Sequence, residues 1–267
     1  MRTIELLRQG TPDRPEMDTA ISAIILRQVG SGSRPETLRI HQPGKNVAFG
    51  RREIHLSGYQ EAVDIARGLG FEATERLAGG RAAIFHPGTI AISWAIPSDE
   101  PRRGIEDRFE EISRYVSSAL KNIGVNAQIG EVPGEYCPGQ HSISVGGRHK
   151  IFGVGQRISS GASHMGGVLV VDGADLIRSV LEPVYEALDF TWRPETTGDI
   201  RGAGVTTDYG EIVASLIAAF EQTYRIEESA LDSDTMAHAS RAAERYLSPK
   251  SSSHRATASE PGSISDI

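Results

Sequence analysis

The sequence contains a single cysteine, Cys137, and no excess of positive charge. One thiol excludes a disulfide within the chain, and no cysteine–histidine cluster of the structural zinc type occurs. With 28 Lys and Arg against 35 Asp and Glu, the net charge is −7, so the chain lacks the basic footprint of a nucleic-acid-binding protein. No apolar run is long enough to cross a bilayer, and the first ten residues are too charged for a signal peptide. These absences predict a cytoplasmic protein whose thiol stays reduced.

Two nucleotide-binding signatures are also missing. No Walker A loop occurs in the chain. The glycines at positions 146, 147, 153 and 155 do not fit a Gly-x-Gly-x-x-Gly motif that opens a helix. The sequence therefore supports neither of the common nucleotide-binding folds.

The length of 267 residues, with 39% hydrophobic residues, suits one large domain or one domain with a small appendage. Residues 1–15 are polar and contain proline, so we expect a loosely attached N-terminal arm. Residues 16–247 carry the apolar periodicity of a single folded domain. Residues 248–267 are rich in Ser and contain Pro and Gly but few large apolar side chains, which predicts a disordered tail.

Hydrophobic periodicity places helices and strands in mixed order. The clearest helix is Ile105–Leu120, where apolar residues recur at helical spacing. A second helix is expected from Asp18 to Arg27, and another follows Asp208, which stands three residues before Glu211 as in a capping box. Strands are expected near residues 37–41, 46–49, 72–77, 82–85, 89–96, 142–145, 150–157 and 167–171. Strands before, between and after helices, without strict alternation, predict an α/β or α+β fold with a mixed sheet flanked by helices.

Cys137 lies in a turn-rich segment, Glu131–Gln140, and is followed directly by Pro138. The proline ring disfavours a helical residue before it, and the Pro-Gly pairs on both sides of the cysteine are turn signals. A buried structural cysteine usually lies inside an apolar run, whereas this one has polar and turn-forming neighbours. The context is compatible with a structural thiol and with a catalytic nucleophile.

A second candidate segment surrounds two adjacent glycines, Gly79 and Gly80. Glycine lets the backbone approach a ligand closely and direct N–H groups at it. Arg76 and Arg81 flank the pair and can bind a phosphate, a carboxylate or an acyl carbonyl. A glycine hairpin with solvated arginines is the structural alternative. His86, before a Pro-Gly pair, is either a hydrogen-bonded turn residue or part of the same binding site.

The third candidate is Lys150, at the start of an apolar strand within Gly146–Arg157. Burial there lowers the pKa of a lysine and suits it to donate to a carbonyl or to move a proton. Gly153 and Gly155 remove side chains from one strand face and leave a slot for a slender ligand. A surface lysine on an edge strand is the alternative.

The order of these segments resembles the lipoate–biotin ligase and lipoyl/octanoyl transferase superfamily. The resemblance rests on Arg76 to His86, on the run from Gly147 to Arg157, on Gly166 to Leu169, and on the strand-ending Val47–Arg51. It covers about residues 18 to 225. The Tyr136–Gly139 loop is similar to the cysteine-dependent octanoyltransferases. The ATP-dependent ligases typically carry a glycine-richer turn and a His-Asp pair, where this chain has His86-Pro87.

The resemblance implies a biotin/lipoate ligase-like catalytic domain with an acyl tunnel lined by the strand glycines and Val154. It also implies that Cys137 and Lys150 are catalytic, that Arg76, Gly79, Gly80, Arg81, His86, Gly153 and Gly155 bind substrate, and that no ATP, metal or other cofactor is needed. The expected donor is an acyl-carrying protein, either the glycine-cleavage H protein or acyl carrier protein. The expected acceptors are the lipoyl domains of 2-oxoacid dehydrogenase complexes.

Two other functions remain open from the sequence. In an ATP-dependent lipoate or biotin ligase, Lys150 binds an acyl-adenylate and Cys137 is incidental. A non-catalytic relative binds lipoyl domains without turnover.

Overall fold

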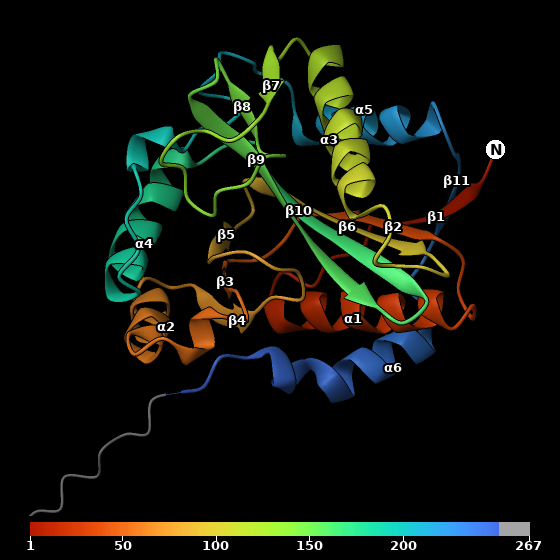
Figure 1. Ribbon diagram of the computed structural model, residues 1–267, viewed down its shortest axis with the longest axis horizontal. Coiled ribbons are helices and arrows are strands. Elements are labelled where there is room, and N and C mark those ends of the chain that lie inside the picture. The colour runs from red at the N-terminus through yellow and green to blue at the C-terminus, as the bar shows by residue number, and fades with distance from the viewer. Residues whose placement is uncertain (251–267) are drawn as a thin grey trace, which may run out of the picture.

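The computed structural model describes residues 1–250, which form two β-sheets and six α-helices (Figure 1). The larger sheet has eight strands in the order β11-β1-β2-β6-β10-β9-β8-β7. Its strands are β1 (Thr3–Leu7), β2 (Thr37–His41), β6 (Thr89–Pro97), β7 (Ala127–Ile129), β8 (Ile143–Val145), β9 (His149–Ser159), β10 (Ala162–Val170) and β11 (Arg225–Ser229). β1 pairs in parallel with β11 and β2, and the other neighbours are antiparallel. The predicted mixed sheet flanked by helices is confirmed.

The smaller sheet has the order β4-β3-β5 and lies beside the larger one. Its strands are β3 (Asn46–Phe49), β4 (Glu72–Glu75) and β5 (Ala83–Phe85). The helices α2 (Tyr59–Gly68) and α4 (Ala174–Ala187) pack against it around a core that includes Val47, Phe49 and Tyr185. The Gly79–Gly80 segment is therefore the connection between β4 and β5.

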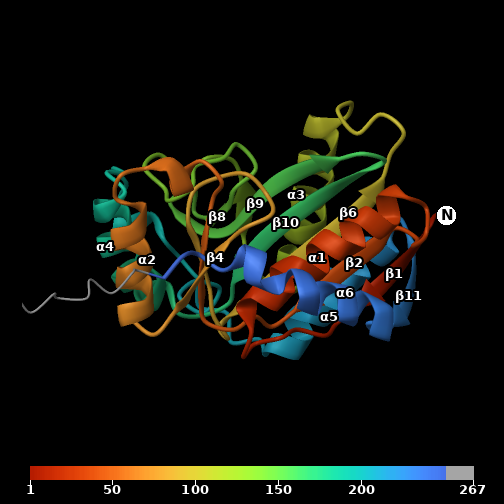
Figure 2. The same cartoon turned by 90° about the horizontal axis from the view of Figure 1, so that it is seen from below.

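Helices cover both faces of the larger sheet (Figures 1 and 2). α3 (Ile105–Asn122) and α5 (Tyr209–Glu221) pack on one face, and α1 (Pro15–Gly30) and α6 (Ser233–Ala242) lie on the other. Short 3-10 helices occur at Glu53–His55, Pro194–Thr196 and Ala243–Tyr246. The sheet is thus the middle layer of the fold, and side chains on its two faces enter different surroundings.

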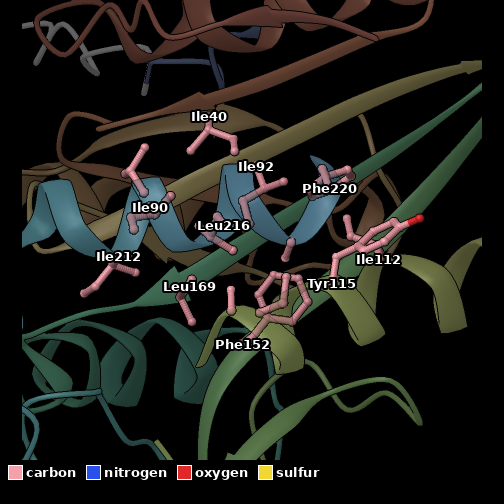
Figure 3. Packing of buried hydrophobic residues seen from close by; sticks show 14 of the residues in the cluster. Ile40, Ile90, Ile92, Ile112, Tyr115, Phe152, Leu169, Ile212, Leu216 and Phe220 are labelled. Carbon is pink, nitrogen blue, oxygen red and sulfur yellow. The ribbon is translucent and has the colours of Figure 1, made fainter. Parts of the chain in front are cut away.

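The core under α3 and α5 is formed by large apolar side chains from both layers (Figure 3). Ile90, Ile92 and Trp94 alternate along β6 and all enter this cluster, as the sequence pattern predicted. The Trp94 ring contacts Phe220 edge-on, with centroids 5.3 Å apart. Tyr115 of α3 stacks obliquely on Phe220 at 4.4 Å, so these aromatic contacts join the two helices to the sheet.

Two helix predictions were correct in detail. Helix α3 starts and ends within two residues of the expected bounds, and Val116 and Leu120 on its apolar face are buried. At α5, the Asp208 side chain accepts from the Glu211 N–H while the Glu211 carboxylate accepts from the Asp208 N–H. This reciprocal capping box satisfies two backbone donors that the first turn leaves free.

The predicted N-terminal arm at residues 1–15 is wrong. Residues 3–7 form β1, in which Ile4, Leu6 and Leu7 are buried, and Pro15 already opens α1. The strand is short and flanked by charges, and its partners are β11 and β2, of which β11 lies more than 200 residues away. Its stability comes from these distant neighbours, which the local sequence does not show.

The prediction that a disordered tail starts at residue 248 is wrong for Ser248 and Pro249. Ser248 is buried, its N–H donates to the Ala73 carbonyl, and its hydroxyl accepts from the Tyr59 hydroxyl at 2.8 Å. Arg67 donates to the carbonyls of Ser248 and Pro249. The prediction for residues 251–267 lies outside the described residues. Within residues 1–250, no helix is both long and apolar enough to span a membrane.

Candidate active site

Cys137 lies in the loop between β7 and β8, in a backbone conformation that is rare for a residue with a side chain. Its φ of +43° is left-handed. The Cys137 N–H donates to the Tyr185 hydroxyl at 3.1 Å, and that hydroxyl donates to the Ala82 carbonyl at 2.9 Å. Tyr185 is fully buried on α4. The loop that carries the thiol is thereby tied to the turn that carries Gly79 and Gly80, and such constrained backbone is frequent at functional sites.

The Cys137 thiol is surrounded by hydrogen-bond donors. Sγ accepts from the Arg81 backbone N–H at 3.2 Å and from the Arg76 guanidinium at 3.4 Å. Burial raises the pKa of the thiol, but the charges of Arg76 and Lys150, together with these hydrogen bonds, outweigh burial and bring the pKa below its ordinary value. The sulfur is thus favoured as the nucleophilic thiolate.

Lys150, the second residue of β9, is buried against the cysteine loop. Its ammonium donates to the Tyr136 carbonyl at 2.9 Å and to the Cys137 carbonyl at 2.8 Å. The same nitrogen lies 4.7 Å from the centroid of the Tyr136 ring. Burial lowers the pKa of Lys150, and the nearby Arg76 charge acts in the same direction, while Cys137 and Glu135 oppose them. The structure excludes the alternative of a surface lysine.

Glu135 is a site residue that the sequence analysis did not single out. Its buried carboxylate lies 3.5 Å from Lys150 Nζ and accepts from the Gly139 N–H at 2.9 Å and from the Ser142 hydroxyl at 2.7 Å. One carboxylate therefore joins the two ends of the loop around Cys137 to the lysine. The position of this acid, two residues before Cys137, could have indicated a role at the site. Tyr185 lies on an apolar helix face, and nothing in the sequence marks it as a site residue.

The Gly79–Gly80 turn is packed directly against the thiol. Gly80 has a φ of +110°, and a Cβ added there would lie 2.8 Å from Cys137 Sγ. The Gly79 N–H already donates to the Gln156 carbonyl at 3.2 Å, and the Gly79 carbonyl accepts from Arg76. Of the two glycines, only Gly80 has a backbone N–H without a hydrogen bond in the described part of the chain. The turn thus brings Arg76, Gly80 and Arg81 together at the sulfur.

The carboxylate of Glu53 holds the far side of this turn. It accepts from the Ala82 N–H at 2.8 Å and from the Gly50 N–H. Glu53 is 2% exposed, and burial raises its pKa, an effect that the two backbone hydrogen bonds oppose. These bonds join the Gly50–Arg51 strand end to the turn at the thiol.

The strand glycines face the site, but Val154 does not. A Cβ at Gly153 would lie 3.0 Å from Lys150 Cε, and one at Gly155 would lie 2.6 Å from the Gly79 carbonyl oxygen. Side chains alternate along a strand, so Val154 points to the opposite face, where it packs against the core cluster of α3 and α5. The expectation that Val154 lines the acyl slot is therefore contradicted.

His86 is also placed away from the thiol. Its Nδ1 accepts from the Gly88 N–H at 3.0 Å, and the ring packs against Gly173 before α4. Burial lowers the pKa of His86, so the ring is neutral at neutral pH. Of the two roles considered for His86, the structure therefore favours a hydrogen-bonded turn residue over a part of the substrate-binding site.

Two cavities share the Leu77–Ala78 segment, which follows Arg76 in the β4–β5 turn. The narrower, of about 100 Å³, runs between β10 and the start of α1 and is lined by Arg76, Gly166 and His164 among others. The wider, of about 770 Å³, is lined by Gly79, Gly80 and Arg81. Arg76 contacts the sulfur and also lines the narrow cavity, so one side chain separates this cavity from the thiol.

The family model of the lipoyl protein ligase A/B catalytic domain matches residues 14–193. The chain belongs to this family. Among its curated relatives, the octanoyl-[GcvH]:protein N-octanoyltransferase of Geobacillus kaustophilus is 28% identical over 162 residues, which cover 61% of this chain and 57% of that protein. The lipoyl-[GcvH]:protein N-lipoyltransferase of Listeria monocytogenes is 25% identical over 59% of this chain and 56% of that protein. The chain thus aligns with little more than half the length of these relatives.

Solved structures of the lipoate ligase type share the fold. Lipoate-protein ligase A bound with ATP has a TM-score of 0.75 at 20% identity and covers 92% of this chain and 95% of its own. The putative lipoate protein ligase Ta0514 from T. acidophilum, with bound lipoic acid, has a TM-score of 0.74 at 20% identity over 92% of this chain and 96% of its own. The biotin/lipoate ligase-like fold expected from the sequence is confirmed.

Proposed function

We propose that this protein is a cysteine-dependent acyltransferase that moves an octanoyl or lipoyl group between lysines of carrier proteins. The donor is a GcvH-type protein, the acceptors are lipoyl domains, and the reaction takes place in the cytoplasm. The names of the curated relatives support the donor and the enzyme class. The observation that carries the proposal is the Cys137 thiol held between Arg76, the Arg81 N–H and the Lys150 ammonium, all of which favour a thiolate.

In the first half of the reaction, the Cys137 thiolate attacks the carbonyl carbon of the acyl-lysine amide. The new C–S bond forms, the C–N bond breaks, and Lys150 gives a proton to the departing lysine amine. Arg76 and the unused Gly80 N–H donate to the developing oxyanion, a contribution of roughly 3–4 kcal/mol per good donor. The product is a thioester on Cys137 and a neutral Lys150.

In the second half, the amine of an acceptor lysine attacks the thioester. Neutral Lys150 takes the proton from that amine, the C–S bond breaks, and the thiolate returns. Burial lowers the pKa of Lys150, so this lysine gives up its proton more readily than an exposed lysine, which suits both directions of transfer. An amide is exchanged for an amide, so the free energy is nearly balanced and no ATP is consumed.

The acyl chain occupies the narrow cavity that begins at Arg76. Apolar and small residues of β6, β10 and the β4–β5 turn line much of it, including Ile92, Gly166, Gly167 and Ala78. Gly166 keeps the slot open, because a Cβ there would lie 2.9 Å from His164 Nε2 and 3.5 Å from Ala78 Cβ. A carbonyl at the mouth of this slot lies beside Arg76 and the thiol.

The proposal is tested by intact-mass measurement of the protein incubated with octanoyl-carrier protein, with and without ATP. We expect an octanoyl adduct on Cys137 and its transfer to an apo lipoyl domain without ATP. Pyrophosphate release that depends on free lipoate and ATP contradicts the proposal and identifies a ligase. Carrier binding without any adduct or transfer identifies a non-catalytic relative.

A further inference from the structure

Arginines gather around the wider cavity of an otherwise acidic protein. Arg51, Arg52, Arg81 and Arg157 all line it, although the chain has 28 basic and 35 acidic residues. They come from the end of β3, from the β4–β5 turn and from β9. We call these four residues the arginine rim. Gly50–Arg51 belongs to one of the segments that carry the family resemblance. The mechanism proposed for Cys137 gives Arg51 no role.

Most of the positive charge of the rim is not paired with a carboxylate. Among the described residues, Arg51, Arg52 and Arg157 have no ion pair, and Arg81 lies over the Phe190 ring with its guanidinium 4.3 Å from the centroid. The carboxylate that lines this cavity, Glu53, is buried and already accepts from two backbone N–H groups. The positive charge of the rim is therefore available to a partner.

The rim lies beside the turn that contacts the nucleophile. Gly80 and Arg81 line the wide cavity, and the Arg81 N–H donates to Cys137 Sγ. The exposed Leu56 and the Phe190 ring supply apolar surface at the same cavity. A macromolecule that presents a lysine to the thiol from this side has to pass the rim.

We propose that the arginine rim is the docking surface for an acidic face of the carrier protein, with carboxylates placed around its modified lysine. This inference rests on the proposed function, in which the acyl group arrives as a lysine amide and brings no phosphate group. Charge complementarity of this kind raises the association rate and fixes orientation, and added salt weakens it. Loss of charge at the rim should therefore lower kcat/KM by raising KM, while the reaction at Cys137 stays unchanged.

The test compares two donors in charge-reversal variants. The variants are the double Arg51→Glu/Arg52→Glu and the single Arg157→Glu. The donors are octanoylated GcvH and octanoyl-N-acetylcysteamine, a small thioester without charge. The matched control is Arg114→Glu, an exposed position on α3 at the opposite face of the sheet. Circular dichroism and melting temperature confirm that each variant folds.

We expect the rim variants to lose tenfold or more in kcat/KM for the protein donor at low salt, mainly by a higher KM. The wild-type rate should fall with added salt toward that of the variants, while Cys137 acylation by the small thioester stays unchanged. Equal rates with the protein donor in all variants overturn the inference, as does equal slowing with both donors. If wild type itself is not acylated by the small thioester, the proposed function fails rather than the docking surface.

Discussion

The ammonium of Lys150 donates to the carbonyl oxygen of Cys137 over 2.8 Å, so the proposed proton carrier also holds the backbone of the proposed nucleophile. Its second hydrogen bond, to the Tyr136 carbonyl, fixes the preceding peptide. The charge of Lys150 lowers the pKa of the thiol that this loop presents. Position and activation of the sulfur therefore depend on one buried side chain, and the two effects need separate tests.

Removal of Lys150 should affect stability as well as transfer. Lys150→Ala leaves the buried Glu135 carboxylate without its cation, and breaking such a pair costs about 3–5 kcal/mol. The double variant Lys150→Met/Glu135→Gln removes both charges and should recover much of that loss, yet remain defective in transfer. Urea unfolding and single-turnover transfer separate the two effects. If the single and double variants are equally stable, Lys150 does not stabilise the buried carboxylate of Glu135.

Glu135→Gln should shift the pH profile of transfer rather than abolish it. The carboxylate raises the pKa of Lys150 against the effect of burial, so its loss lowers that pKa further. The limb of the kcat profile that reports Lys150 should then move to lower pH. A profile that keeps its position while the maximal rate falls indicates a purely structural role for Glu135.

The low pKa of Cys137 should be visible in its reactivity. Alkylation by iodoacetamide, followed against pH, should give a midpoint below the ordinary cysteine value of about 8.5. Arg76→Met removes both a charge and a hydrogen bond from the sulfur, so the midpoint should rise. A midpoint that is the same in both proteins shows that Arg76 does not activate the thiol.

The two glycines beside the thiol should respond differently to the same substitution. Gly80→Ala forces a side chain onto a φ of +110° and into Arg76 and Sγ, so Cys137 reactivity should fall at least tenfold. Gly79→Ala is the matched control, because the nearest atom to its new Cβ is 3.8 Å away. If both variants react like wild type, the turn does not shape the thiol's surroundings.

His164 should make the protein less stable as the pH falls below about 6.5. Burial lowers the pKa of His164 to about 4, so the unfolded chain binds a proton over a pH range where the folded chain does not. Stability then rises with pH between these pKa values, by about 1.6 kcal/mol from pH 5 to 6.5. Urea unfolding of wild type and His164→Gln at both pH values measures the difference, since other groups titrate equally in both. Identical pH dependence contradicts the prediction.

The sequence was most informative where the signal is local. The α3 stripe, the Asp208 capping box and the alternation along β6 each follow from periodicities that a single element imposes. Strand β1 was not predicted, because the strands that pair with it lie elsewhere in the chain. Val154 was predicted to line the acyl slot with Gly153 and Gly155, but its side chain lies on the other face of the strand. The family resemblance supplied the fold and the pairing of the cysteine with the lysine.

The surroundings of the thiol were less accessible from the sequence. The contact between Arg76 and Cys137 joins residues 61 positions apart, and the Tyr185 hydroxyl reaches the Cys137 N–H from an apolar helix face. Neither contact has a sequence pattern. The buried state of Lys150 and the role of Glu135 likewise follow from how the loop folds back on β9.

The proposed mechanism requires an acyl group to be carried on the Cys137 sulfur. Mass spectrometry of the intact protein after brief mixing with octanoylated GcvH, without ATP and without acceptor, measures it directly. We expect an adduct of one octanoyl group that maps to Cys137, is released by neutral hydroxylamine and is transferred when an apo lipoyl domain is added. Cys137→Ala that still accumulates the adduct, or that transfers octanoyl at the wild-type rate, would contradict the proposed mechanism.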